Sequence, residues 1–435
     1  FSASSAVYLQ DSRICEYKFD GKELYQYVTT HKLIKVMNDK GIELFNKIFI
    51  PSGNTSEITE VKARVITSSG KVIDIPGDKI KDEEIDGRRY KLFAMEGLDK
   101  GSEVEYLHVV KRTPTFFGGE IFQSREVPYV LATMTIITPA HLKFEAKGFN
   151  GFTVLKDTLI ADQRILNGYA ENVKELDEEK YGLRDPHLQR VDYKFSYNLD
   201  KKSDVELYTW KEFSRNAYIN FTTITDKERK ALNKFLDAIK LPENASEEKK
   251  IQLIEDYCKN KINVDEKLVS EDASALDAIV KTTNTSPYGM CKFMANLFEI
   301  AGIRYQFVFP SVRDQLPIDE ELENWNRIEE TLLYFPGTGQ FIQPDAAIMR
   351  YPFVTPYWSG TRGLFLKSTT IGDMKTAIGR FDSIPMLPFD QHAHNLELSA
   401  KFDASGDSLV IQSKQILLGH GATAYRPIWA FLTKD

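Results

Sequence analysis

The 435-residue sequence has few cysteines, no long hydrophobic run and no surplus of positive charge. Its three cysteines, Cys15, Cys258 and Cys291, form no CxxC pair, which argues against a disulfide framework or a zinc ribbon. No apolar run is long enough to cross a bilayer, so we expect no transmembrane segment. A formal net charge of -7 lacks the excess of lysine and arginine that binds phosphates, so we expect no nucleic-acid partner.

The composition is that of a folded protein with more than one domain. Hydrophobic residues make up 42% of the chain, which provides enough apolar surface to form real cores. A chain of 435 residues usually divides into two or three domains. The first residue is Phe1 rather than Met, so we expect that an N-terminal segment was removed, either as a signal peptide or by deliberate truncation.

The spacing of apolar residues divides the chain into three stretches and predicts an α+β multidomain fold. Over residues 1–215, period-two alternation between Gly- and Pro-containing turns predicts an antiparallel β domain of sandwich type. From Thr225 the period becomes 3.6, and helices followed by short strands predict an α+β core over residues 222–385. The β pattern returns from Asn395 and predicts the start of a third, C-terminal β domain over residues 390–435.

Four helices and three strands are expected in the central core. Thr225-Asp226 is a candidate N-cap for the first helix, and the second begins at about Ser246. The third covers residues 273–280, and the fourth begins at Gly289. The expected strands cover residues 305–309, 331–334 and 340–342.

Cys291 is the residue in this core that is the clearest candidate for a catalytic role. Gly289-Met290-Cys291 is expected to open the fourth helix, where free backbone N–H groups and the helix dipole favour a thiolate. A thiolate can attack a carbonyl carbon. The same pattern also fits a cysteine that packs as a small hydrophobic residue.

Several segments of this core resemble a known family. The segments are 251–262, 274–279, Gly289-Met290-Cys291-Lys292, 294–298 and Ala301-Gly302-Ile303. Together, residues 250–366 resemble the transglutaminase-like core, which shares its fold with papain-type cysteine proteases. Residues 1–215 resemble an uncharacterised β domain that often precedes such cores in secreted proteins of Gram-negative bacteria, and residues 417–426 resemble the β domain that follows them. The resemblance implies an extracytoplasmic location, in the periplasm or at the cell surface.

The family's mechanism uses a cysteine, a histidine and an aspartate, and only the cysteine is found here. The resemblance puts Cys291 at the nucleophile position, Gln343 at the aspartate position and Glu330 at the histidine position. An alternative register, based on Trp325-Asn326, puts Arg327 at the histidine position instead. No histidine lies between Cys291 and Pro385 in the sequence.

Two functional hypotheses follow from this pattern. In the first, the chain is a non-catalytic module that binds a protein, peptide or glycan of the cell envelope, without a cofactor. In the second, Cys291 serves an active cysteine protease or amidase with an unusual base such as Glu330. We favour the first, because the loss of two triad members is hard to compensate. His392 and His394 could form a metal pair, but linker residues are the simpler interpretation, and we expect no metal site.

Overall fold

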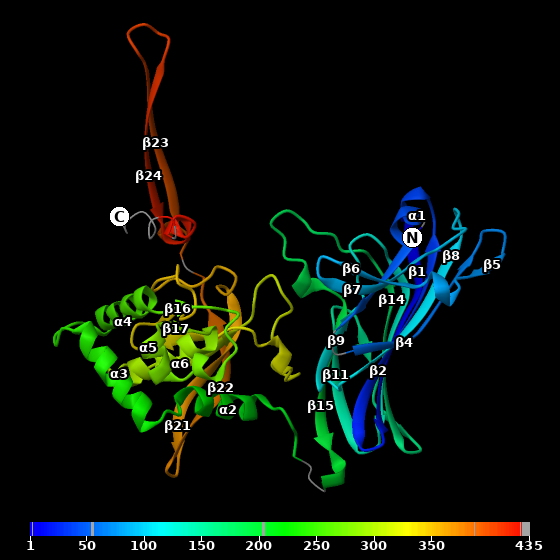
Figure 1. Ribbon diagram of the computed structural model, residues 1–435, viewed down its shortest axis with the longest axis horizontal. Coiled ribbons are helices and arrows are strands. Elements are labelled where there is room, and N and C mark those ends of the chain that lie inside the picture. Colours follow the sequence, from blue (N-terminus) through cyan, green and yellow to red (C-terminus); the bar gives the residue numbers. More distant parts are fainter. Residues whose placement is uncertain (2, 54–55, 202–204, 387, 427, 429–435) are drawn as a thin grey trace. The chain divides into compact units, whose positions relative to one another are not determined.

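The computed structural model describes residues 1–435 except for 2, 54–55, 202–204, 387, 427 and 429–435. The chain forms two compact units. Unit 1 contains Phe1–Thr209 and Asp319–Asn326, and unit 2 contains Trp210–Ile318 and Arg327–Asp435. Six α-helices and several β-sheets occur among the described residues, which agrees with the expected α+β class in its coarse form (Figure 1). The domain boundaries at 215, 222, 385 and 390 stay a prediction.

Unit 1 is built almost entirely of β-strands. The strands are β1 (Ala6–Asp20), β2 (Glu23–Val36), β3 (Lys47–Ser52), β4 (Ser56–Ile66), β5 (Val72–Asp74), β6 (Lys81–Ile85), β7 (Arg88–Ala94), β8 (Glu103–Arg112), β9 (Phe117–Ile121), β10 (Tyr129–Pro139), β11 (Leu142–Phe149), β12 (Thr153–Val154), β13 (Thr158–Ile160), β14 (Gln163–Val173) and β15 (Arg190–Asn198). A short helix, α1 (Asp39–Phe45), lies between β2 and β3.

These strands form one large sheet and two small ones. The nine-stranded sheet has the order β12-β14-β10-β1-β2-β8-β4-β5, and β13 pairs with β14. The small sheets are β11-β15-β9 and β3-β7-β6. Strands β1 and β10 are parallel, which departs from the antiparallel domain that we expected. Alternation along one strand shows only that one face is buried, and the direction of its partner depends on the chain path.

Two hydrophobic cores join the small sheets to the large one. The first core contains side chains of the large sheet and of β11 and β15, among them Tyr17, Met134, Phe144 and Tyr193. The second contains side chains of the large sheet and of β3 and β7, among them Ile34, Val65, Ile50 and Phe93. Each core therefore lies between two sheets, as in β-sandwich packing.

Charged side chains surround the buried Asp11 of the large sheet. Asp11 is fully buried and accepts two hydrogen bonds from the Arg13 guanidinium, at 3.2 and 3.1 Å. Lys32 lies 3.5 Å from Asp11, and Arg13 also pairs with Glu120. The four charges balance, which lowers the cost of removing them from water.

His108, on β8, makes the stability of unit 1 sensitive to acid. Its pKa is lowered from 6.5 to about 4, mainly by burial and in smaller part by the charges of Lys32 and Arg13. Because only the unfolded chain takes up this proton, stability is lost as the pH falls from about 6.5 to about 4, by up to about 3 kcal/mol. His108→Gln should flatten the pH dependence of guanidinium unfolding over this range, with hydrogen exchange in β2 and β8 identifying unit 1.

The exposed His187 provides the matched control for this experiment. His187→Gln should leave the pH dependence as it is in the wild-type protein. Equal slopes for the wild type and His108→Gln would contradict the assignment of the acid sensitivity to His108.

Unit 2 combines five helices with short and long strands among its described residues. Its helices are α2 (Trp210–Thr222), α3 (Asp226–Ile239), α4 (Glu247–Lys261), α5 (Leu276–Thr282) and α6 (Pro287–Ile300). Its strands are β16 (Asn263–Val264), β17 (Asn284–Thr285), β18 (Gln306–Pro310), β19 (Leu332–Phe335), β20 (Gln340–Ile342), β21 (Thr361–Ile371), β22 (Met374–Ile384), β23 (Ala393–Phe402) and β24 (Leu409–Leu418).

Local capping explains where two of the predicted helices begin. Thr225 accepts a hydrogen bond from the backbone N–H of Glu228, and the Glu228 side chain accepts from the backbone N–H of Thr225, forming a capping box. Ser246 caps α4 in the simpler way, by accepting from the N–H of Lys249. These two helix starts are confirmed. Helix α2 and the long β21–β22 hairpin were not predicted, because we interpreted residues up to 215 as β and did not assign 361–384.

Helices α2 and α6 pack on one face of a five-stranded sheet with the order β20-β19-β18-β21-β22. Phe307 of β18 packs against Phe221 of α2 at 4.7 Å between ring centroids. Phe335 of β19 packs against Phe298 of α6 at 4.9 Å. These aromatic contacts fix the position of α6, and hence of Cys291, relative to the sheet.

Candidate functional site

Cys291 lies on α6, but two residues further into the helix than the sequence suggested. The helix begins at Pro287 rather than at Gly289, so Cys291 is its fifth residue. Ser286 is the N-cap and accepts a hydrogen bond from the N–H of Gly289 at 3.1 Å. The expected position in the first turn is therefore wrong. Ser286-Pro287 is a typical helix start that we overlooked, since proline is favoured at the first helical position.

The start of α6 is packed closely against a neighbouring backbone segment. A Cβ atom added at Gly289 would overlap the carbonyl oxygen of Ala273 and the hydroxyl of Thr285. These two groups are themselves joined, because the Thr285 hydroxyl donates to Ala273 O at 2.7 Å. Only glycine fits at this point, and its absence of a side chain lets α6 approach the segment before α5.

The surroundings of Cys291 favour the neutral thiol. The residue is 3% exposed. Burial raises the pKa of the Cys291 thiol well above its ordinary value, and the negative charge of Asp345 raises it further. Among the described residues, no histidine contributes to this shift. Cys291 therefore stays protonated at neutral pH.

Two carboxyl groups, Glu330 and Asp345, influence one another near this cysteine. The pKa of Glu330 is raised to about 7, mainly by burial and in smaller part by the charges of Asp345, Glu329 and Glu266. Burial also raises the pKa of Asp345, although its interactions with Lys259 oppose the shift. One Asp345 carboxyl oxygen is buried without a hydrogen-bond partner. The charge of Asp345 thus raises the pKa of both Cys291 and Glu330. Asp345 was not among the site residues predicted from the sequence.

Gln343 follows directly after β20 and acts as a structural link. Its side-chain oxygen accepts hydrogen bonds from the hydroxyl of Thr355 at 2.7 Å and from the N–H of Thr355 at 3.2 Å. Its backbone oxygen accepts from the ammonium group of Lys259 at 2.7 Å. Gln343 is buried, and its hydrogen bonds hold the segment that leads to Asp345.

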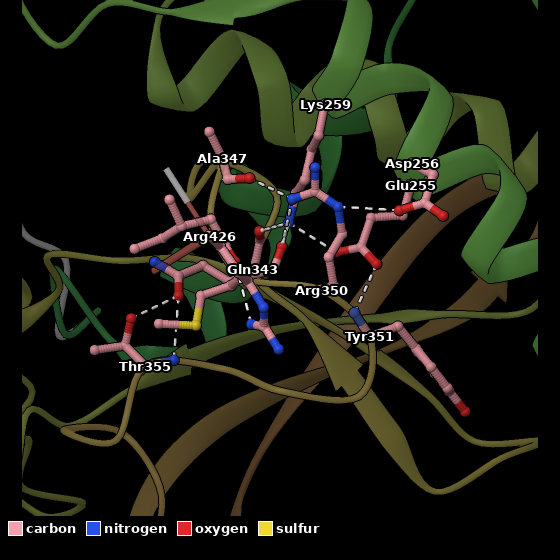
Figure 2. Close-up of polar contacts among 11 residues, drawn as sticks. Glu255, Asp256, Lys259, Gln343, Ala347, Arg350, Tyr351, Thr355 and Arg426 are labelled. Carbon is pink, nitrogen blue, oxygen red and sulfur yellow. Dashed lines mark hydrogen bonds and ion pairs between the residues drawn. The ribbon is translucent and has the colours of Figure 1, made fainter. Parts of the chain in front are cut away.

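A buried ion pair on α4 supports the same segment. Lys259 donates to Glu255 at 2.7 Å and to the backbone oxygens of Gln343 and Met349 at 2.7 and 2.9 Å (Figure 2). The second carboxyl oxygen of Glu255 accepts from the N–H of Tyr351 at 2.7 Å. Burial lowers the pKa of Lys259, while the charge of Glu255 acts to raise it. The pair therefore ties helix α4 to both ends of the segment 343–351. In the sequence, the i,i+4 spacing of Glu255 and Lys259 is the feature that could have predicted this ion pair.

The remaining candidates lie away from these contacts. Arg327 ends a 3₁₀ helix (Trp325–Arg327), and its equivalence to the histidine position stays a prediction. His392 and His420 stack at 4.5 Å beside the ends of the β23–β24 hairpin, and His420 donates to the backbone oxygen of Val354 at 2.7 Å. His394 lies 3.2 Å from Gln415 across the same hairpin. These contacts explain the histidines as structural residues.

A large hollow in unit 2 borders the five-stranded sheet and the helices α2 and α6. Gln306 pairs with Tyr334, and Tyr334 with Phe341, so these side chains lie on the face opposite Phe307. The hollow has a volume of about 1110 Å³. Its lining includes Tyr334, Phe341, Phe365, Arg304 and Lys367. Aromatic side chains beside cationic and hydroxyl groups are typical of ligand-binding surfaces.

Comparisons with known proteins agree with the coarse architecture. The model of the family "Domain of Unknown Function with solved-structure structure (DUF3857)" matches residues 25–176, which lie within unit 1. A putative protease from Parabacteroides distasonis ATCC 8503 has a crystal structure similar to this chain, with a TM-score of 0.56 and 12% sequence identity. The match covers 93% of this chain and 79% of that chain. At this identity the likeness concerns the fold alone.

Other comparisons add little. An M1 zinc metallopeptidase from Deinococcus radiodurans matches with a TM-score of 0.25 and 8% identity, over 43% of this chain and 42% of that chain. A TM-score of 0.25 is too low to bear on the fold. No curated protein matches the sequence. No helix among the described residues is long and apolar enough to span a membrane.

Proposed function

We propose that this chain is a non-catalytic protein with a transglutaminase-like, papain-type core that binds a peptide or glycan of the bacterial cell envelope. In this proposal, Cys291 marks the nucleophile position of an ancestral site, and Glu330 and Gln343 replace its histidine and aspartate. The observation that carries the proposal is the buried thiol of Cys291, whose pKa is raised by burial and by Asp345. A cysteine enzyme needs the opposite environment, because the thiolate is the attacking form.

The alternative is an active cysteine protease or amidase that uses Glu330 as its base. One observation favours it, since a Glu330 pKa of about 7 is suitable for proton transfer near neutral pH. The thiol, however, has an ordinary pKa of 9.0 before burial raises it. A gap of two pKa units costs about 3 kcal/mol for transfer of the proton to Glu330, and burial increases that cost. We therefore favour the non-catalytic function.

The hollow that borders the five-stranded sheet of unit 2 supports the binding part of the proposal. It offers aromatic rings from Tyr334, Phe341 and Phe365, and the cations of Arg304 and Lys367. Isothermal titration with short peptides and with peptidoglycan fragments should detect binding, and Tyr334→Ala should weaken it. Binding that Tyr334→Ala leaves unchanged, or no binding of either class at about 1 mM ligand, would count against this hollow as the binding site.

The protonation state of Cys291 can be measured by alkylation. Iodoacetamide should modify native Cys291 at pH 7.5 much more slowly than the same residue in unfolded protein, because burial raises the pKa of its thiol and leaves little of the reactive thiolate. The rate should still be rising at pH 9.5. Mass spectrometry of the digested protein measures each cysteine separately.

Two buried cysteines in the same protein serve as internal controls. Cys15 on β1 and Cys258 on α4 are both fully buried, and burial raises the pKa of Cys15 to about 11. They should react as slowly as Cys291 in the native state. A Cys291 rate that reaches a plateau below about pH 7.5 would indicate an activated nucleophile and overturn the non-catalytic proposal.

A further inference from the structure

The segment Asp319–Asn326 joins β18 to β19 in the sequence, yet it belongs to unit 1. The chain thus leaves unit 2 after Ile318 and returns to it at Arg327. The segment forms a short turn in which Asp319 accepts hydrogen bonds from the N–H groups of Glu321 and Leu322. We call residues 319–326 the strap.

Lysines of the sheet β11-β15-β9 hold the acidic residues of the strap. Lys147 of β11 donates to both carboxyl oxygens of Asp319, at 2.9 and 2.8 Å, and to Glu321 at 2.7 Å. Lys194 of β15 donates to Glu323 at 2.6 Å. The Lys194 side chain is only 1% exposed, so its pair with Glu323 is shielded from water.

Aromatic and amide groups hold the other end of the strap. The Trp325 ring stacks on Phe117 at 5.9 Å and meets the edge of Tyr208 at 5.3 Å. The Asn324 side chain donates to the backbone oxygen of Gly118 at 3.3 Å. The strap therefore covers the edge strand β9 as well as the two lysines.

The recognising groups are distributed along the length of the strap. Asp319 and Glu321 contact Lys147, Glu323 contacts Lys194, and Trp325 contacts the aromatic pair. Asn324 and Asn326 add side-chain contacts to the backbone oxygens of Gly118 and Phe117, so the contacts run along the whole strap. Side chains of the strap make these contacts, as the side chains of a recognised peptide do, and among the described residues no ladder of backbone pairs is involved.

We propose that the sheet β11-β15-β9 of unit 1 carries a binding surface for an acidic peptide that contains an aromatic residue, and that the strap occupies this surface as an internal ligand. The surface consists of Lys147, Lys194, Phe117 and Tyr208. Tethering at both ends gives the strap a high effective concentration, so a peptide from another protein binds only when the strap is released. This inference is independent of the proposed function of unit 2.

The test uses the full chain with a strap that no longer fits the surface. In Glu321→Lys/Glu323→Lys/Trp325→Ala, Lys194 keeps its second partner, Glu206 at 2.6 Å, and is not left as an unpaired buried charge. The probe is a fluorescent synthetic peptide with the sequence of residues 317–328. Fluorescence anisotropy at low salt should show binding to the variant that is at least about 100-fold tighter than binding to the wild type.

Two controls make the result specific to the surface. Glu175→Lys/Glu179→Lys alters exposed acidic residues of unit 1 by the same charge and should leave peptide binding at the wild-type level. A peptide of the same composition in scrambled order should bind the strap variant at least about tenfold more weakly, since the spacing is lost. Absence of peptide binding to a folded strap variant, or equal binding of the scrambled peptide, would overturn the proposal.

A second measurement avoids the variant altogether and covers the case in which it does not fold. In the wild-type protein, hydrogen exchange of residues 319–326 should become faster between low salt and about 1 M NaCl, because salt screens the partly exposed Lys147 contacts. The peptide should then begin to compete for the surface through its aromatic residue. Exchange that does not respond to salt would show that the strap is an ordinary part of the core and would refute its role as an exchangeable ligand.

Discussion

Lys259→Met will lower the free energy of unfolding of unit 2 by about 3–5 kcal/mol. Methionine has a similar length but no charge, so the substitution leaves Glu255 ionised and buried, with a single remaining donor at Tyr351. It also removes the donor for the backbone oxygens of Gln343 and Met349. Guanidinium unfolding, with hydrogen exchange in α4 to identify unit 2, will measure the loss.

An exposed ion pair of the same spacing is the control. Lys281 and Asp277 are also at i,i+4, at 3.5 Å, but the Lys281 side chain is 70% exposed. Lys281→Met should cost less than about 1 kcal/mol. Adding Glu255→Gln to Lys259→Met should recover part of the loss, because the uncompensated charge is then gone. A loss below about 1 kcal/mol for Lys259→Met alone would show that water reaches the pair.

Gly289→Ala will destabilise unit 2, although helix propensity alone predicts the opposite. Alanine inside a helix is favoured over glycine by about 1 kcal/mol. At Gly289 the new Cβ would overlap the Ala273 carbonyl oxygen and the Thr285 hydroxyl, and the backbone at Ala273 cannot move without disturbing α5. Overpacking of this kind costs about 1–3 kcal/mol and occasionally more, so after the gain in helix propensity we expect a net loss of up to about 2 kcal/mol.

The measurement is thermal unfolding of the variant, together with the rate of Cys291 alkylation in the native state. Separation of α6 from the segment before α5 should expose Cys291 and speed its alkylation. Gly77→Ala is the control, since a Cβ at Gly77 meets no atom within 4 Å. A Gly289→Ala protein that is as stable as the wild type would mean that the close approach at Ala273 can relax at little cost.

Local chemistry made several features of this protein predictable. The hydroxyl residues Thr225 and Ser246 mark the starts of α3 and α4, because a cap interacts only with the next three residues. The β alternation of residues 395–411 likewise predicted the strands β23 and β24. Helix α6 was placed two residues late although its Ser286-Pro287 start was visible, so that error was one of interpretation.

The candidate site was only partly predictable. The sequence identified Cys291, Glu330 and Gln343 through a family resemblance, but it could not indicate their ionisation. Burial raises the pKa of Cys291 most, and the charge of Asp345, which lies 54 positions further along the chain, raises it as well. Both effects depend on packing between segments that are distant in sequence.

By itself, the sequence determined the two regular periods, the helix caps, the shortage of cysteine and the absence of histidine between Cys291 and Pro385. Those features belong to neighbouring residues or to composition. Only the tertiary structure decided that Cys291 is a buried neutral thiol, that Lys259 supports the segment with Gln343, and that residues 319–326 belong to unit 1. The physical reason is the same in each case, because dielectric environment, charge pairing and docking are properties of side chains that only folding brings together.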